Sequence, residues 1–307
     1  MVSLSLVIPA TNDPVTLERV LAAVEGADPA PDEVIVVREP ESLGPAAARN
    51  RGAQQAAADV LVFLDADVEV HPDAFGRIRA AFEEDRELAA LFGSYDDDPG
   101  SDGVVSAFRN LLHHHVHHEG AGPATTFWAG LGAVRREVFD SLGGFDAIRY
   151  PQASVEDIEL GMRLHATGAR IVLDPEIQGK HLKTWTLLTM TETDLLRRGV
   201  PWLRLVLESR SRSSALNLGP RHVVATGASV LLVIAVLRRD LRLALGLLAL
   251  LVVLDRRFYV LLARRQGPRV AAAGLALHVA HRLTSAAAVP LALSRHLREH
   301  LRSEDRA

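Results

Sequence analysis

The 307-residue chain contains no cysteine. This absence excludes a disulfide framework, a thiolate metal site and a cysteine nucleophile, so metal ligands must be Asp, Glu or His side chains. The sequence also shows no internal repeat, no low-complexity linker and no basic leader. Its first residues, VSLSLVIPA, have the β-branched and apolar character of a buried strand. We therefore expect this part of the chain to remain in the cytoplasm.

Basic residues are scarce in the first two thirds of the chain. Residues 1–195 carry 15 Lys and Arg against 32 Asp and Glu, a net charge of −17. Residues 196–307 carry 19 Arg against 6 acidic residues, a net charge of +13. The acidic first part argues against a nucleic acid partner, because phosphate binding requires a basic face. The basic, leucine-rich second part suits an anionic membrane surface.

Short apolar runs alternate with helical patterns at the start of the chain. We expect strands at residues 4–8, 33–37 and 60–64 and helices at 15–24 and 45–57. This alternation predicts an α/β fold with a mostly parallel sheet and helices on both faces. Further helices are expected at 73–84, 104–118 and 155–165, and further strands at 89–94, 127–135 and 171–173.

Three apolar stretches follow residue 195, at 223–237, 243–254 and 270–293. A membrane-spanning helix needs about 20 apolar residues, so the first two are short, and the third contains two histidines and an arginine. We expect two domains, an α/β domain over 1–195 and a helical, membrane-associated region over 196–307. A soluble helical subdomain that buries these faces is the alternative. Arginines flank every stretch, so the positive-inside rule does not fix a topology.

The expected strand VLVFL ends in Asp65-Ala66-Asp67. In parallel α/β sheets, ligands bind beyond the carboxyl ends of the strands. Two carboxylates one residue apart at that position can hold Mg²⁺ or Mn²⁺ and the ribose or phosphates beside it. An ordinary strand followed by a polar turn would give the same pattern.

The segment LGPAAARNRG opens the helix that precedes this strand, with Pro45 at a tolerated position in the first turn. It places Arg49 near the aspartate pair, where a guanidinium can bind a carboxylate or a phosphate. An ordinary surface arginine is the alternative.

Two acidic residues, Glu156 and Asp157, begin another expected helix, EDIELGMRL. A carboxylate that the fold holds near a metal can act as a general base. Acidic residues are also common at helix N-termini because they interact favourably with the helix dipole. This segment alone does not decide between the two interpretations.

Five segments occur in one order over roughly residues 3–195, namely LSLVIPA, LGPAAARNRG, VFLDADVEVHPDAF, AGLGAVRREVFDSLGGFD and EDIELGMRL. Together they resemble the inverting family 2 glycosyltransferases, which have the GT-A fold. The resemblance implies metal-dependent transfer of one sugar from a nucleotide-sugar to an acceptor hydroxyl. Since the second part of the chain suits a membrane, we expect the acceptor to be a lipid or a cell-envelope glycan. The protein would lie at the cell membrane with its catalytic domain facing the cytoplasm.

By this resemblance, Asp65 lies near the nucleotide, and Asp67 binds the Mg²⁺ or Mn²⁺ that bridges the donor diphosphate. Asp157 is the base that deprotonates the acceptor hydroxyl, with Glu156 beside it. Arg49 would then lie on the donor side.

The resemblance also assigns loops to the two substrates. Pro9, Ala10 and the following loop would contact the nucleotide, whereas the Gly130–Gly132 turn and residues 143–146 would shape the acceptor side. Trp128 either stacks on a sugar or packs in the core, and we favour the acceptor side.

The chain departs from the family pattern in two places. The loop after the second strand, residues 38–40, lacks the usual acidic pair and Gly-Ser turn, which leaves the nucleobase open. The Gln-x-x-Arg-Trp motif of processive members is replaced by His181, Lys183 and Trp185 in HLKTW, so we predict a single addition. His181 would touch the metal or diphosphate, Lys183 would offer a cation to the donor, and Trp185 would lie on the acceptor side. A solvent-exposed His and Lys fit the sequence equally well.

The run His113–His118 contains two histidine pairs at i,i+4 spacing, which is a known metal-ligand spacing. No third ligand lies nearby in the sequence, so we favour a solvated or acceptor-lining face over a second metal site.

Three other functions remain open. A polyprenyl-phosphate sugar synthase would share the fold and the donor but would use a phosphate as nucleophile. A nucleotidyltransferase that makes nucleotide-sugars would need a glycine-rich, basic N-terminal loop, which residues 8–14 do not provide. A non-catalytic carbohydrate-binding relative would not need the three aspartates Asp65, Asp67 and Asp157.

Overall fold

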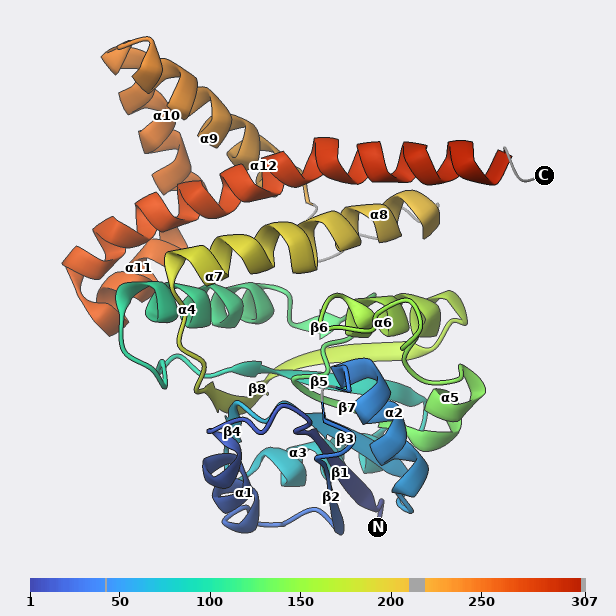
Figure 1. Cartoon of the computed structure of the whole chain (residues 1–307). Coiled ribbons are helices and arrows are strands. Elements are labelled where there is room, and N and C mark those ends of the chain that lie inside the picture. Colours follow the sequence, from blue (N-terminus) through green and yellow to red (C-terminus); the bar gives the residue numbers. More distant parts are fainter. Residues whose placement is uncertain (42, 210–218, 305–307) are drawn as a thin grey trace. The chain divides into compact units, whose positions relative to one another are not determined.

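The computed structural model describes residues 1–41, 43–209 and 219–304. These form two compact units (Figure 1). The first comprises Met1–Asp102 and Asn110–Thr184, and the second comprises Gly103–Arg109 and Trp185–Ala307. The predicted helical region of 196–307 includes 210–218 and 305–307, which lie outside the described residues. The predicted division into two domains at residue 195 stays a prediction.

The first unit is built on one mixed sheet with strand order β2-β1-β3-β7-β5-β8-β4, and β6 pairs with β8. Strand β1 pairs in parallel with β2 and β3, as the alternating pattern predicts. Strand β7 lies antiparallel between β3 and β5. The strands are β1 Leu4–Pro9, β2 Glu33–Val37, β3 Val60–Leu64, β4 Val68–Val70, β5 Leu88–Tyr95, β6 Gly122–Pro123, β7 Leu131–Arg135 and β8 Arg170–His181.

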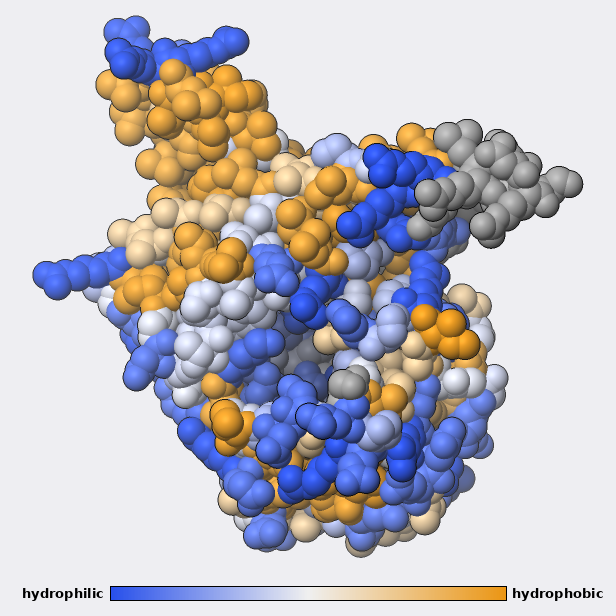
Figure 2. Space-filling view, viewed as in Figure 1, coloured by the Kyte–Doolittle hydropathy of each residue, from blue (hydrophilic) through white to orange (hydrophobic). Residues whose placement is uncertain are grey.

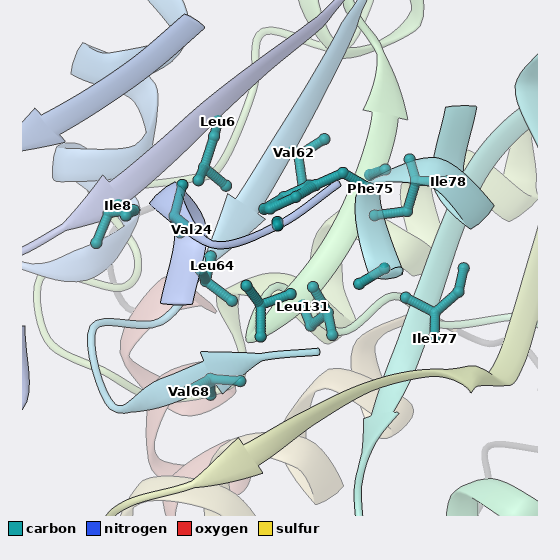
Figure 3. Close-up of a cluster of buried hydrophobic side chains, with 14 of the residues drawn as sticks. Leu6, Ile8, Val24, Val62, Leu64, Val68, Phe75, Ile78, Leu131 and Ile177 are labelled. Atoms are coloured by element: carbon teal, nitrogen blue, oxygen red, sulfur yellow. The ribbon is translucent and has the colours of Figure 1, made fainter. Parts of the chain in front are cut away.

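Helices cover both faces of this sheet (Figure 1). Because side chains alternate along a strand, Leu6, Ile8 and Val62 contribute to a core with α1 and α3 (Figure 3). The neighbouring Phe63 packs on the other face against Phe139, with ring centroids 5.4 Å apart. Full burial of such side chains stabilises the fold by about 1.5–3 kcal/mol each. The helices are α1 Leu17–Glu25, α2 Pro45–Gln55, α3 Ala74–Glu84, α4 Val104–Glu119, α5 Arg136–Ser141 and α6 Glu156–Ala166.

A glycine allows α2 to lie close to β1. A Cβ atom on Gly52 would lie 2.3 Å from a methyl carbon of Val7. The contact fixes the helix directly over the strand, and thereby fixes Arg49 one turn earlier on the same helix.

The described part of the second unit is helical. Its elements are α7 Leu187–Glu192, the π-helix η1 Thr193–Gly199, α8 Val200–Ser209, α9 Pro220–Leu237, α10 Leu241–Leu254, α11 Arg256–Gln266 and α12 Pro268–Glu304. The three predicted apolar stretches fall in α9, α10 and α12. Figure 2 shows apolar residues over the surface of α9 and α10.

Buried charges lie inside this helical unit. Asp194 is paired with Arg109 at 3.0 Å and with His281 at 2.7 Å. Asp255 is paired with Arg282 and, at 3.2 Å, with Arg221. Each buried carboxylate therefore has cationic or hydrogen-bonding partners, which an isolated buried charge would lack.

Candidate active site

The Asp65-Ala66-Asp67 segment lies at the carboxyl end of β3, where the sequence places it. The backbone N–H of Asp65 donates to the carbonyl of Gly130 at 3.0 Å, and the N–H of Val68 donates to the carbonyl of Asp65 at 3.0 Å. These bonds form a tight turn from β3 into β4. The side chains of Asp65 and Asp67 are 31% and 28% exposed, so both can reach a ligand.

A buried guanidinium links this strand end to the start of α6. Arg49 donates to Asp65 at 2.6 Å and to Glu156 at 3.0 Å, and it lies over the Phe145 ring at 5.5 Å. Burial alone would disfavour the charged form of Arg49, but Asp65 and Glu156 together raise its pKa. The Arg49 side chain therefore joins three segments that the sequence analysis identified separately: its own helix, the end of β3 and the start of α6.

Asp157 differs from its neighbour Glu156 in what surrounds it. One carboxylate oxygen of Asp157 accepts from the N–H of Ala129 at 3.2 Å, and the other accepts from the N–H of Ile158 at 2.8 Å. Burial and the charge of Glu156 raise the pKa of Asp157 to about 6, although Arg49 opposes the shift. A carboxylate with a pKa in this range is suited to general base chemistry near neutral pH.

The carboxylate of Glu156 is engaged by other groups. It accepts from Arg49 at 3.0 Å and from the backbone N–H of Ser154 at 2.8 Å, and the residue is 4% exposed. These contacts fit a role in holding Arg49 and the start of α6.

Asp67 and His181 face each other across neighbouring strands. Val68 in β4 is opposite His181 in β8, and the N–H of Leu182 donates to the carbonyl of Asp67 at 2.8 Å. The Nε2 atom of His181 lies 3.8 Å from a carboxylate oxygen of Asp67. Burial would raise the pKa of Asp67, but His181 and Lys183 outweigh this effect and lower it.

This pair fits one kind of metal site. Among the residues that the structure describes, no group of three or more His, Asp or Glu side chains is arranged to hold a metal ion. A closed, all-protein metal cage is therefore absent from the described part of the chain. An ion that takes most of its ligands from substrate phosphates and water needs only one or two protein ligands, and the Asp67 carboxylate with the His181 ring 3.8 Å away is compatible with such a site.

The turn between residues 128 and 130 joins several parts of the site. A Cβ atom on Gly130 would lie 2.3 Å from the Trp128 ring, so the indole occupies the space of a side chain there. The Trp128 ring meets Tyr95 edge-on at 5.0 Å, and Tyr95 stacks on His181 at 4.1 Å. Ala129, between Trp128 and Gly130, donates its N–H to Asp157.

The histidine run is engaged mainly in holding α4 on the sheet. His114 bonds through Nδ1 to the carbonyl of Tyr95 at 2.9 Å, and His117 bonds to the carbonyl of Gly93 at 2.9 Å. His113 packs on the Tyr95 ring at 4.1 Å. His114 and His117 are buried, so the expectation of a solvated face was wrong for these two residues, because the carbonyls at the end of β5 bind their rings. The acceptor-lining alternative stays a prediction.

Other predicted site residues occupy separate positions. Pro9 ends β1, and the N–H of Ala10 donates to the carbonyl of Val37 at 2.9 Å, which places both residues at the carboxyl end of β1. Lys183 is exposed, and its carbonyl accepts from Ser101 at 2.7 Å. Trp185 belongs to the second unit, where its ring lies 5.1 Å from the Arg109 guanidinium.

Three groups in the site were not identified from the sequence. They are the Tyr95 ring against His181, the Ala129 N–H on Asp157, and the Asn50 side chain. Asn50 accepts from the N–H of Phe145 at 2.9 Å and donates to its carbonyl at 2.8 Å, which holds the turn at Gly144. The position of Tyr95 at the end of β5 was the only signal in the sequence that pointed to any of them.

Comparison with known proteins agrees with this geometry. Residues 24–143 match the family model described as Glycosyl transferase family 2. The O-antigen biosynthesis protein RfbC of Myxococcus xanthus is 32% identical over 142 residues, which is 41% of this chain and 11% of that protein. The match thus spans about a tenth of the relative's length.

Among solved structures, the mannosyltransferase PcManGT from Pyrobaculum calidifontis, in complex with GDP-Man and Mn²⁺, has a TM-score of 0.53 at 17% identity. The alignment covers 96% of this chain and 87% of that one. Glucosyl-3-phosphoglycerate synthase from Mycobacterium tuberculosis has a TM-score of 0.45 at 18% identity, with 67% and 79% of the two chains covered.

The mixed sheet has the GT-A fold, as does the PcManGT structure. The chain carries a family 2 glycosyltransferase domain, matched over residues 24–143.

Proposed function

We propose that the protein transfers one sugar from a nucleotide-sugar to a hydroxyl group of a lipid or cell-envelope glycan, with inversion at the anomeric carbon. The observation that carries this proposal is the Arg49 bridge between Asp65 and Glu156. It brings the carboxyl end of β3, where donors bind in such sheets, next to Asp157 at the start of α6.

The donor side consists of the carboxyl ends of β1 and β3. Pro9, Ala10 and Asp65 contact the nucleotide, and Lys183 offers a positive charge to the diphosphate. Asp67 and His181 hold a divalent cation, which when bound offsets the negative charge that develops on the departing diphosphate. The Mn²⁺ in the PcManGT complex supports a divalent cation but does not choose between Mg²⁺ and Mn²⁺.

Asp157 takes the proton of the attacking hydroxyl. Its pKa of about 6 leaves the carboxylate largely ionised at pH 7 and still basic enough to accept a proton. The Ala129 N–H holds one of its oxygens, while Arg49 and Glu156 fix the helix start behind it. Because Asp157 accepts a proton and does not attack the sugar, the reaction is one displacement and inverts the anomeric centre.

The acceptor side includes Trp128 and Gly130. An indole such as that of Trp128 presents a flat apolar face that can stack on a sugar ring. The name of the RfbC relative supports a cell-envelope glycan as acceptor. The exposed apolar helix α9 supports a position at the cell membrane, and we place the catalytic domain on the cytoplasmic side.

The test separates donor binding from transfer. A thermal-shift panel of nucleotide-sugars with Mn²⁺ identifies the donor, since a ligand of the native state raises its apparent stability. With that donor, Asp157→Asn should bind normally and transfer poorly, whereas Asp67→Asn should bind poorly. Asp140→Asn, at an exposed carboxylate on α5, is the matched control.

Three outcomes would contradict the proposal. They are a normal transfer rate for Asp157→Asn, full turnover of the native enzyme in excess chelator, and retention of the anomeric configuration. A normal rate for Asp157→Asn with polyprenyl phosphate as acceptor would instead identify a polyprenyl-phosphate sugar synthase, because a phosphate needs no strong base.

A further inference from the structure

Helices α9 and α10 form a hairpin whose two helices pack through small side chains. Ala225, Ala228 and Leu251 are buried where the two helices meet, and Val279 of α12 also packs against this cluster. The buried hydroxyl of Ser229 donates to the carbonyl of Ala225 at 2.8 Å, so it needs no partner from outside the helix. Small residues and internally bonded hydroxyls are typical of helix packing within lipid.

The outer surface of the hairpin is apolar and uncovered. Helix α9 has 18 mainly apolar residues, yet only 22% of it is buried. A core helix of a soluble protein would be mostly buried. Figure 2 shows this apolar surface, to which Leu231, Ile234, Leu237, Leu241, Leu245 and Val253 contribute exposed side chains.

The hairpin has no polar face along most of its length. Residues 230–237 of α9 and 243–254 of α10 contain no polar side chain. A helix that lies flat in the headgroup layer needs a polar face toward water. A helix that is apolar all round belongs inside a protein core or a bilayer. The hairpin therefore fits the hydrocarbon region rather than the membrane surface.

Arginines mark both ends of the hairpin. At its tip lie Arg238, Arg239 and Arg242. At its base, Arg221 at the start of α9 pairs with Asp255 after α10 at 3.2 Å, which closes the hairpin there. A helix rises 1.5 Å per residue, so Arg221 and Arg238 lie about 26 Å apart along α9, near the roughly 30 Å of a bilayer core.

The arginines at the tip determine how far the hairpin is inserted into the bilayer. Helix α10 is shorter, about 21 Å, which exceeds one leaflet but falls short of the full core. Local thinning of the bilayer and arginine side chains that extend to the headgroups can make up the difference at a small cost per ångström. Stopping halfway would leave three arginines at the bilayer centre, which costs far more.

We infer that the α9–α10 hairpin crosses a phospholipid bilayer twice, with its tip on the side opposite the catalytic domain. This inference rests on the membrane location in the proposed function. At the base, α11 turns Phe258 and Leu262 into the protein. Its other side forms a shallow pocket of about 340 Å³ lined by Arg256, Arg257, Val260, Leu261 and Arg264.

This base surface lies at the level of anionic headgroups. Arginines beside apolar side chains suit that layer, where lipid phosphates meet the first carbons of the acyl chains. The base carries Arg256, Arg257, Arg264, Arg265 and Arg269, all within reach of lipid phosphates at that level. Among the described residues, no other helix is long and apolar enough to cross a membrane alone, so the catalytic domain lies on the side of the base.

The absence of native cysteine makes a direct test possible, because single-cysteine variants need no prior substitution. Arg238→Cys places a thiol at the tip, Arg264→Cys places one at the base, and Asp140→Cys marks the catalytic domain. Full-length variants are expressed, and sealed inverted membrane vesicles are treated with a membrane-impermeant maleimide. Arg264→Cys and Asp140→Cys should be labelled, whereas Arg238→Cys should be labelled only after detergent opens the vesicles.

Two results would overturn the inference, and they differ in what else they affect. Labelling of Arg238→Cys in sealed vesicles would show that the hairpin does not cross, and the membrane location would stand. Recovery of the protein as a soluble dimer without detergent would refute both the crossing and the membrane location. Nucleotide-sugar binding by that soluble protein would still support glycosyl transfer.

Discussion

The two units differ in the residues that they expose. In the first unit, Leu6 and Val62 lie inside the sheet core and have no exposed surface, while charged groups gather at the strand ends. In the second unit, Asp194 and Asp255 are buried among helices, while Leu237 and Leu245 are 77% and 66% exposed. The first pattern suits water on all sides. The second suits a lipid solvent, in which apolar side chains face outward and charges must find partners within the protein.

The largest expected effect tests the chemical role of the first unit. Asp157→Asn keeps the shape of the side chain but removes the base, so transfer should slow by about 10²–10⁴-fold. Donor affinity, measured by calorimetry, should remain close to that of the native enzyme. If Asp157 only stabilised the start of α6, the transfer rate would be nearly unchanged. That result would contradict the catalytic role proposed for the first unit.

A second prediction concerns the buried charges of the second unit. Asp255→Ala leaves Arg282, which is 4% exposed, without its carboxylate partner. Breaking a buried pair in this way typically costs about 3–5 kcal/mol. Urea unfolding in detergent micelles should show the loss. Asp240→Ala, at the exposed tip of the hairpin, should cost only about 1 kcal/mol through loss of its cap on Leu243. Equal losses would mean that Asp255 is not buried as described.

A third prediction compares one substitution in the two units. Leu64→Ala, at a side chain with no exposed surface, should destabilise the protein by about 2–5 kcal/mol because it leaves a cavity. Leu245→Ala, at a side chain 66% exposed, should change the stability in detergent by less than about 0.5 kcal/mol. A large loss at Leu245 would indicate that another protein surface covers the hairpin.

The smallest expected effect is a pH dependence of stability that comes from Asp157. Its pKa is about 6 in the folded protein, whereas the ordinary value for an aspartate is 3.8, so folding favours the protonated form. The stability that this provides is complete below pH 3.8 and is lost as the pH rises through 6. In metal-free buffer, the melting temperature of Asp157→Asn should therefore rise relative to the native protein between about pH 4 and pH 7. A constant difference across this range would contradict the raised pKa.

The sequence predicted best where local pattern and tertiary structure agree. The expected strands at 33–37 and 60–64 match β2 and β3 residue for residue, because both are short apolar runs bounded by turns. Parallel strands bring their carboxyl ends to one edge of the sheet. Arg49 was expected to lie near Asp65 because its helix directly precedes the Asp65 strand, and the structure joins the two through an ion pair that Glu156 extends.

The rest depends on contacts between distant parts of the chain. Strand β8 was expected to cover only 171–173, but it runs from Arg170 to His181. Its second half, DPEIQGKH, has no apolar alternation, and it is extended because β4 and β5 pair with it. The stacking of Tyr95 on His181 likewise joins residues that no local pattern connects. Trp185 belongs to the helical unit, and its expected place on the acceptor side stays a prediction.

The contact between Trp128 and Gly130 has a consequence for substitutions in this turn. The Trp128 indole fills the volume that a side chain at position 130 would need, so side chains at 128 and 130 compete for the same space. A side chain at position 130 alone therefore forces the Trp128 ring to move. A smaller residue at 128 removes this clash for Ala or Ser at 130. The effects of the two substitutions on stability should therefore be strongly non-additive, with the double variant more stable than the two single changes predict.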